Sequence, residues 1–204
     1  MSVPDRAIVL DRSPLAPFWH RGRHGAPAPG APGVVITERR HAIAQLMARR
    51  SAGSVLAERM MSSLGIGLPG AGRASAAGDL RALSIGPGAW LVTAPRQKDR
   101  ELAGLLEQAA GDAASVASQT HGKVTLAIAG RAARDCLGKG CRVDLHPRVF
   151  SPGHVAVTPV GHISIVLSEI EPAGSYELIM ASSLAASFLE WLEAAAAEYG
   201  YEVA

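Results

Sequence analysis

Cysteines, aromatic residues and long apolar runs are all scarce in this sequence. Of its 204 residues two are cysteines, Cys136 and Cys141, and 4% are aromatic. No apolar run is long enough to cross a bilayer. Charged residues interrupt the first twenty positions, which excludes the apolar centre of a secretory signal peptide. We therefore expect a cytoplasmic protein with reduced thiols and no membrane partner.

An excess of charge of one sign is also missing. The 20 lysines and arginines nearly balance the 18 acidic residues, giving a formal net charge of +2. The basic residues are scattered in short pairs such as Arg39-Arg40 and Arg49-Arg50. Nucleic-acid-binding domains usually concentrate basic residues on one stripe or carry a recognisable motif. We therefore expect no nucleic-acid partner.

The hydrophobic pattern predicts alternating hairpins and helices. Hydrophobic residues make up 48% of the chain, enough to bury a core. Because hairpins alternate with helices, the order predicts an α+β fold with mixed or antiparallel sheets and helices on one face. Two ferredoxin-like lobes, at approximately 38–118 and 119–204, would produce it. Strands are expected at 42–48, 81–85, 89–92, 116–119, 123–129, 155–159, 162–167 and 175–180, and helices at 51–64, 98–110, 132–137 and from Ser182 or Ser183 to Gly200.

Residues 1–37 differ from the rest of the chain. The stretch 20–33 is rich in glycine, proline and alanine and has neither a helical nor a strand period. We interpret 1–37 as a flexible N-terminal arm. Composition fits equally well a mobile surface loop and an extended arm lying across a partner subunit.

Reactive side chains concentrate between Cys136 and His162. Two cysteines with His146, His154 and His162 could in principle supply zinc ligands, but their spacing lacks the close pairs of structural zinc sites. We expect no metal. Cys141 with the nearby His146 could form a thiol catalyst, yet that chemistry needs a spatial convergence that a sequence does not show.

Motifs for cofactors and catalysis give no stronger candidate. Gly138-Lys139-Gly140 lacks the spacing of a phosphate-binding loop, and no dinucleotide-binding fingerprint follows a predicted strand. The nucleophile elbow of α/β-hydrolases is also missing. Pairs of carboxylates, such as Glu190 with Glu193, fit a solvated surface. A binding or scaffolding role is therefore favoured, with no catalytic and no cofactor-binding residue in this chain.

The same segment carries a resemblance to a known family. The run 130–150 and the later pieces 161–162, 175–178 and 187–200 resemble sarcosine oxidase gamma subunits, in the expected order. The resemblance covers roughly residues 40–200. The residues that carry the motif, which we treat as candidate structural or interface residues, are Arg134, Asp135, Lys139, Gly140, Cys141, Asp144, Leu145, His146, Pro147, Phe150, Gly161 and His162.

The resemblance implies a fold similar to part of the glycine-cleavage T-protein, which handles folate. It also implies a non-catalytic gamma subunit in a heterotetramer with alpha, beta and delta subunits, which would carry FAD, FMN, NAD and tetrahydrofolate. Such a complex demethylates sarcosine to glycine, yielding formaldehyde or 5,10-methylenetetrahydrofolate and hydrogen peroxide. Two alternatives stay open: the small subunit of a related N-methylglutamate-type dehydrogenase, and a stand-alone folate-binding or one-carbon transfer module.

Overall fold

The computed structural model describes residues 12–27, 30–171 and 174–204. Its helices are α1 (Gly53–Leu64), α2 (Asp99–Ala110), α3 (Ala133–Gly138) and α4 (Ala185–Ala196). Its strands are β1 (Gly22–His24), β2 (Val34–Arg39), β3 (His41–Ala48), β4 (Ala74–Ala77), β5 (Leu80–Gly86), β6 (Ala89–Pro95), β7 (Ala114–Ser118), β8 (Lys123–Ala129), β9 (Val155–Val160), β10 (Ile163–Glu171), β11 (Ser175–Ala181) and β12 (Tyr201–Val203).

The first lobe contains a five-stranded antiparallel sheet in the order β4-β5-β6-β3-β7. Taking β3-α1-β5-β6-α2-β7 as the unit, the chain order is β-α-β-β-α-β, the ferredoxin-like arrangement. Leu56 and Met60 of α1 and Leu102 and Leu106 of α2 are buried against this sheet. Their helical spacing explains why both helices cover one face.

The second lobe repeats this order around a seven-stranded sheet, β1-β12-β2-β8-β11-β10-β9. Here β8-α3-β10-β11-α4-β12 forms the β-α-β-β-α-β unit, while β2 separates β8 from β12. The β2–β12 pair is parallel and all other pairs in this sheet are antiparallel, so the sheet is mixed. The predicted fold class is therefore confirmed.

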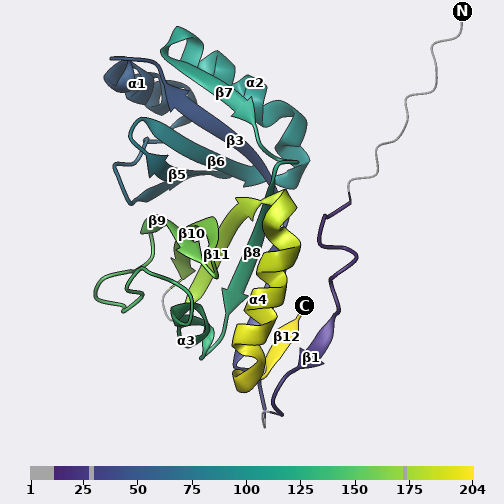
Figure 1. The fold of residues 1–204 in the computed structure, drawn as a ribbon. Helices are drawn as coiled ribbons and strands as arrows, with labels where there is room; N and C mark the ends of the chain where they lie inside the picture. Colours follow the sequence, from purple (N-terminus) through teal and green to yellow (C-terminus); the bar gives the residue numbers. More distant parts are fainter. Residues whose placement is uncertain (1–11, 28–29, 172–173) are drawn as a thin grey trace, which may run out of the picture.

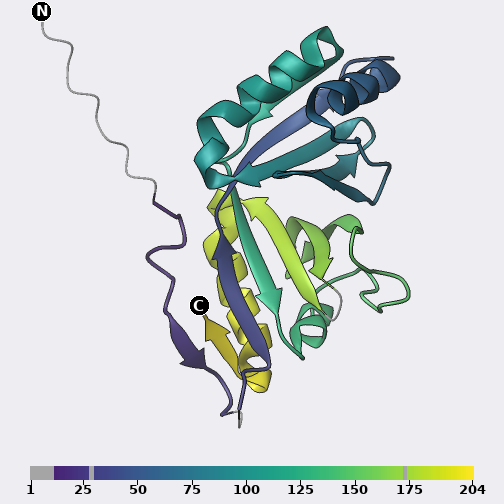
Figure 2. The same ribbon diagram turned by 180° about the vertical axis from the view of Figure 1, so that it is seen from behind.

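The two sheets pack against each other through the faces that the helices leave open. Alternation along each strand separates the two faces. The small core between the sheets consists of Ile43, Leu83, Leu91, Val155, Val166 and Ile179. Figure 1 shows α1 and α2 outside the first sheet and α4 outside the second, and Figure 2 shows the same layers from behind. The molecule is thus a four-layer arrangement of helices, two sheets and helices.

The N-terminal segment is part of the second lobe where the structure describes it. Val34 and Ile36 on β2 are fully buried, and β1 pairs with β12. Leu15 is 0% exposed in the same core. The expected arm boundary at residue 37 falls inside β2, so residues 34–37 belong to the sheet and not to an arm. Residues 1–11 and 28–29 of the proposed arm lie outside the described residues.

The strands and helices predicted in the body of the chain all form; β8 has the predicted bounds, and the other elements have shifted ends. Gly65 ends α1 in a left-handed conformation, and its N–H donates to the Met61 carbonyl. The last helix begins later than Ser182 or Ser183, the expected start: a 3-10 turn at Ser182–Leu184 precedes α4, and no side chain caps it. The strands β1, β2, β4 and β12 were not predicted. No helix in the described part of the chain is long and apolar enough to span a membrane.

Candidate functional site

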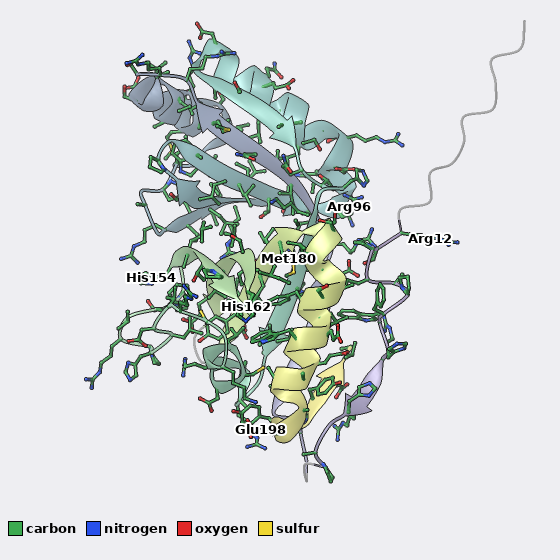
Figure 3. All side chains as sticks on the ribbon, in the orientation of Figure 1. Arg12, Arg96, His154, His162, Met180 and Glu198 are labelled. Atoms are coloured by element: carbon green, nitrogen blue, oxygen red, sulfur yellow. The ribbon has the colours of Figure 1, made fainter. Side chains whose placement is uncertain are left out.

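The motif segment begins on α3 and joins that helix to the end of α4. The Lys139 ammonium donates to the Ala195 carbonyl, pairs with Glu198 at 2.5 Å and lies 4.6 Å from the centre of the Tyr199 ring. Figure 3 labels Glu198 at this end of α4. The last carbonyls of a helix lack partners within it and favour a nearby cation. Lys139 therefore acts as a cap for α4.

Two glycines of the motif create room for one tryptophan. Gly140 follows α3 and Gly161 begins the turn between β9 and β10; a Cβ atom on either would overlap the Trp191 ring, at 2.5 Å from Cδ2 in the case of Gly161. Gly161 and His162 both have positive φ, at 54° and 69°. Positive φ at both central residues is what a two-residue hairpin turn requires. The ring of Trp191 thus packs α4 onto the backbone of both segments.

The Asp144–Phe150 segment is an ordered loop with buried ends. The Asp144 carboxylate accepts a hydrogen bond from the His146 N–H at 2.8 Å, and the His146 carbonyl accepts one from Phe150 at 2.9 Å. Leu145 and Phe150 are buried in the second lobe, whereas Asp144, His146 and Pro147 are exposed. The loop is therefore held by its own backbone bonds and two apolar anchors, and it presents polar side chains to solvent.

The motif residues Arg134 and Asp135 on α3 lie in different surroundings. The Arg134 guanidinium donates to the Tyr176 hydroxyl at 3.2 Å and lies 4.0 Å from the Glu169 carboxylate. Glu169 is buried, and its Oε2 atom has no hydrogen-bond partner among the described residues. Asp135 is exposed in the first turn of α3. Arg134 consequently ties α3 to β10 and β11, while Asp135 faces solvent.

The two cysteines are free and lie in apolar surroundings. Cys136 is fully buried on α3, and burial raises the pKa of its thiol to about 11. Burial also raises the pKa of the half-buried Cys141 thiol, against a weaker lowering by a hydrogen bond from Val143. Only the thiolate is a strong nucleophile. Both cysteines are therefore poorly suited to nucleophilic chemistry near neutral pH.

The motif residues do not meet in a single pocket. They lie along a path from α3 through the exposed loop to the β9–β10 turn, and Figure 3 shows His154 and His162 at separate places on this path. The described residues include no group of three or more histidine, cysteine, aspartate or glutamate side chains that could hold a metal ion. The arrangement that the structure does produce is a packed junction with one projecting loop.

A second cluster of charges lies between the lobes. The Arg81 guanidinium on β5 donates to one Glu177 carboxylate oxygen on β11 at 2.5 Å, and His41 on β3 contacts the other at 3.3 Å. All three side chains are largely buried. Burial by itself would raise the pKa of Glu177, but His41 and Arg81 outweigh burial and hold that pKa below its usual range.

This cluster lines a cavity of about 900 Å³ between the two sheets. Three of its acidic residues have partners within the chain: Glu177 binds Arg81, Asp79 binds Lys98 at 2.8 Å, and Glu38 accepts a hydrogen bond from the Ser13 hydroxyl. The fourth, Glu169, lies 4.0 Å from Arg134 and has one carboxylate oxygen without a hydrogen-bond partner among the described residues. Cavities at the junction of two lobes are common binding places. Sequence reasoning missed this site, because 96 residues separate Arg81 from Glu177 and neither belongs to a local motif.

Comparison with known proteins gives matches over most of the chain. The model of the "Sarcosine oxidase, gamma subunit family" matches residues 49–198. A sarcosine oxidase subunit gamma from Arthrobacter sp. is 32% identical over 161 residues, which are 78% of this chain and 76% of that protein.

Solved structures agree with the sequence matches. A chain of the heterotetrameric sarcosine oxidase from Corynebacterium sp. U-96 has a TM-score of 0.78 at 25% identity, covering 93% of this chain and 96% of that one. The glycine cleavage system aminomethyltransferase T from Bartonella henselae has a TM-score of 0.58 at 13% identity, covering 82% of this chain and 49% of that one, and shares the fold. The chain belongs to the sarcosine oxidase gamma subunit family.

Proposed function

We propose that this chain is the non-catalytic gamma subunit of a heterotetrameric, flavin-dependent sarcosine oxidase, which it stabilises. The observation that carries the proposal is that the family motif residues make packing contacts within the chain. Lys139, Gly140 and Gly161 fasten α3 and the β9–β10 turn to α4, through bonds and contacts within the chain. Residues that pack one helix against a turn support a scaffolding role better than a chemical one.

In this proposal the chemistry belongs to the other subunits. Alpha, beta and delta chains bind FAD, FMN, NAD and tetrahydrofolate, and the complex oxidatively demethylates sarcosine to glycine with release of formaldehyde or 5,10-methylenetetrahydrofolate and hydrogen peroxide. The Corynebacterium complex is heterotetrameric and was solved with pyrrole 2-carboxylate, which supports the proposed assembly and shows a small carboxylate ligand for that enzyme. The motif residues Asp144, His146 and Phe150 would then order a loop at a subunit interface.

Co-purification tests the proposal. The tagged chain is drawn from an extract of its native cells, and the absorbance spectrum and the masses of the bound chains are recorded. Flavin absorbance together with a large and a medium partner chain is the expected result, and turnover of sarcosine in place of N-methylglutamate would identify the substrate. A colourless monomer would contradict the proposal.

A folate-binding or one-carbon transfer module is the second candidate. It is favoured by the fold shared with the aminomethyltransferase T and by the polar cavity between the lobes. Quenching of pterin fluorescence on the purified chain would support it. Loss of that quenching in Glu177→Gln, with no loss in Glu190→Gln on the outer surface of α4, would assign the pterin to the cavity.

A further inference from the structure

The edge strand β9, the loop before it and the segment bridged to that loop combine unpaired cations with exposed apolar side chains. Arg73, Arg142 and Arg148 are all exposed, and no carboxylate among the described residues pairs with their guanidinium groups. Val149 is 54% exposed and Val157 is 52% exposed. We call these five residues the docking face. Val157 also lines an apolar groove, and a contiguous apolar surface marks a site that a partner would cover.

The loop that carries Arg142, Arg148 and Val149 is held by hydrogen bonds within it and by a buried anchor. The only acidic residue between Arg142 and Val149 is Asp144, and its carboxylate accepts the His146 N–H instead of pairing with an arginine. Phe150 anchors the end of the loop, and its ring lies 5.7 Å from that of His154. Figure 3 shows His154 where the loop meets the sheets. A preordered loop loses little conformational entropy when it binds.

The loop leads directly into an uncharged groove. His154 pairs with Arg73 in an isolated bridge, and the Val155 N–H donates to the Gly72 carbonyl at 2.9 Å. The groove, about 490 Å³ in volume, is lined by Pro69, Ile85, Pro87, Trp90 and Val157 among others, and its lining contains no charged residue. The docking face therefore has an apolar hollow beside a cationic loop.

We propose that the docking face binds one of the larger subunits of the oxidase complex, through an acidic surface from which an apolar side chain enters the groove. This inference rests on the proposed function. An acidic partner would pair with the arginines and steer the encounter, while the groove would provide the apolar burial that holds the complex together. The faces of α1 and α2, on the other side of the first lobe, play no part in it (Figure 1).

Matched variants test the inference. One pair compares Arg142→Glu/Arg148→Glu with Arg50→Glu/Arg100→Glu, which makes the same charge change before α1 and on α2. The second pair compares Val157→Asp with Met61→Asp, because Met61 on α1 is 53% exposed. Each chain is co-expressed with the other subunits of its complex, and the fraction that co-elutes with flavin absorbance is measured at two salt concentrations. Circular dichroism of each free chain checks folding.

We expect both docking-face variants to lower the co-eluting fraction about tenfold, while both controls stay at the wild-type level, since like-charge contacts and a buried carboxylate both oppose docking. Wild-type co-elution should also weaken as salt rises. If the docking-face variants co-elute as well as wild type, or if the controls fall equally, the docking face is wrong while the proposed function stands. If wild type itself does not co-elute with flavin, the proposed function fails first.

Discussion

Arg81 on the first lobe and Glu177 on the second form a largely buried ion pair at 2.5 Å, and His41 contacts the same carboxylate. Each lobe has a core of its own, and the core between the sheets is small. The ion pair therefore adds a directional contact to a limited apolar interface. A buried carboxylate that loses its partner is strongly destabilising.

Replacing Arg81 with Met should lower the free energy of unfolding by about 2 kcal/mol or more, because Glu177 keeps only His41 as a partner. The double variant Arg81→Met/Glu177→Met should be less destabilised than Arg81→Met alone, since no carboxylate is left buried. Urea denaturation of the purified chains measures both. A double variant whose loss of stability equals the sum of the losses in Arg81→Met and in Glu177→Met would contradict a direct coupling.

Stability should fall in acid through Glu177. The pKa of this carboxyl is depressed in the folded chain, so the folded state binds its proton less readily than the unfolded state. Its stabilisation is present above the unfolded pKa, about 4.3 for glutamate, and is lost as pH falls through the folded value. Thermal unfolding between pH 7 and pH 3 should show a steeper acid loss in wild type than in Glu177→Gln. An equal loss of stability with falling pH in wild type and in Glu177→Gln would exclude Glu177 as the cause of the acid loss.

The contact between Trp191 and the motif glycines predicts a steric defect. Gly140→Ala should destabilise the chain by about 1–3 kcal/mol, because the added methyl group meets the indole ring. Gly138→Ala is the matched control on α3, where a Cβ atom meets nothing within 4 Å. It should be neutral or slightly stabilising. Adding Trp191→Phe should recover part of the Gly140→Ala loss, and equal losses in the two glycine variants would argue against the contact.

Leu15 tests whether the N-terminal segment belongs to the folded unit. Its side chain is fully buried in the second lobe, so Leu15→Ala should cost about 2–5 kcal/mol of stability. Phe18 lies three residues away and is 49% exposed. Phe18→Ala should therefore have little effect. Thermal unfolding of both variants measures these effects. An unchanged melting temperature in Leu15→Ala would indicate that the segment is an independent arm and not part of the folded lobe.

Cys141 should react slowly with alkylating reagents. Burial raises the pKa of its thiol, so little thiolate is present at neutral pH. Iodoacetamide at pH 7.5, followed by mass spectrometry, should modify the native chain far more slowly than the urea-unfolded chain. Rapid stoichiometric modification of the native chain would instead favour a thiol enzyme.

Local patterns were enough to predict much of the fold. Alternation at Val124, Leu126 and Ile128 predicted β8, and the apolar spacing of α4 predicted the last helix, because both depend on residues close together in the chain. The short strands β1 and β12 lack such a signal. They form because β12 pairs with β2 and β1 pairs with β12, and these partners are in place only when the rest of the sheet has formed.

The sequence by itself also determined the family, since the run from Lys139 to Pro147 is fairly specific and the other pieces follow it in the expected order. What the motif does was decided only by the tertiary structure, because Lys139, Gly140 and Gly161 act on α4, some thirty to sixty residues further along. Likewise the Arg81–Glu177 pair and the docking face bring together residues that no local pattern connects. Such contacts arise from the packing of two sheets, and packing is a property of the whole chain.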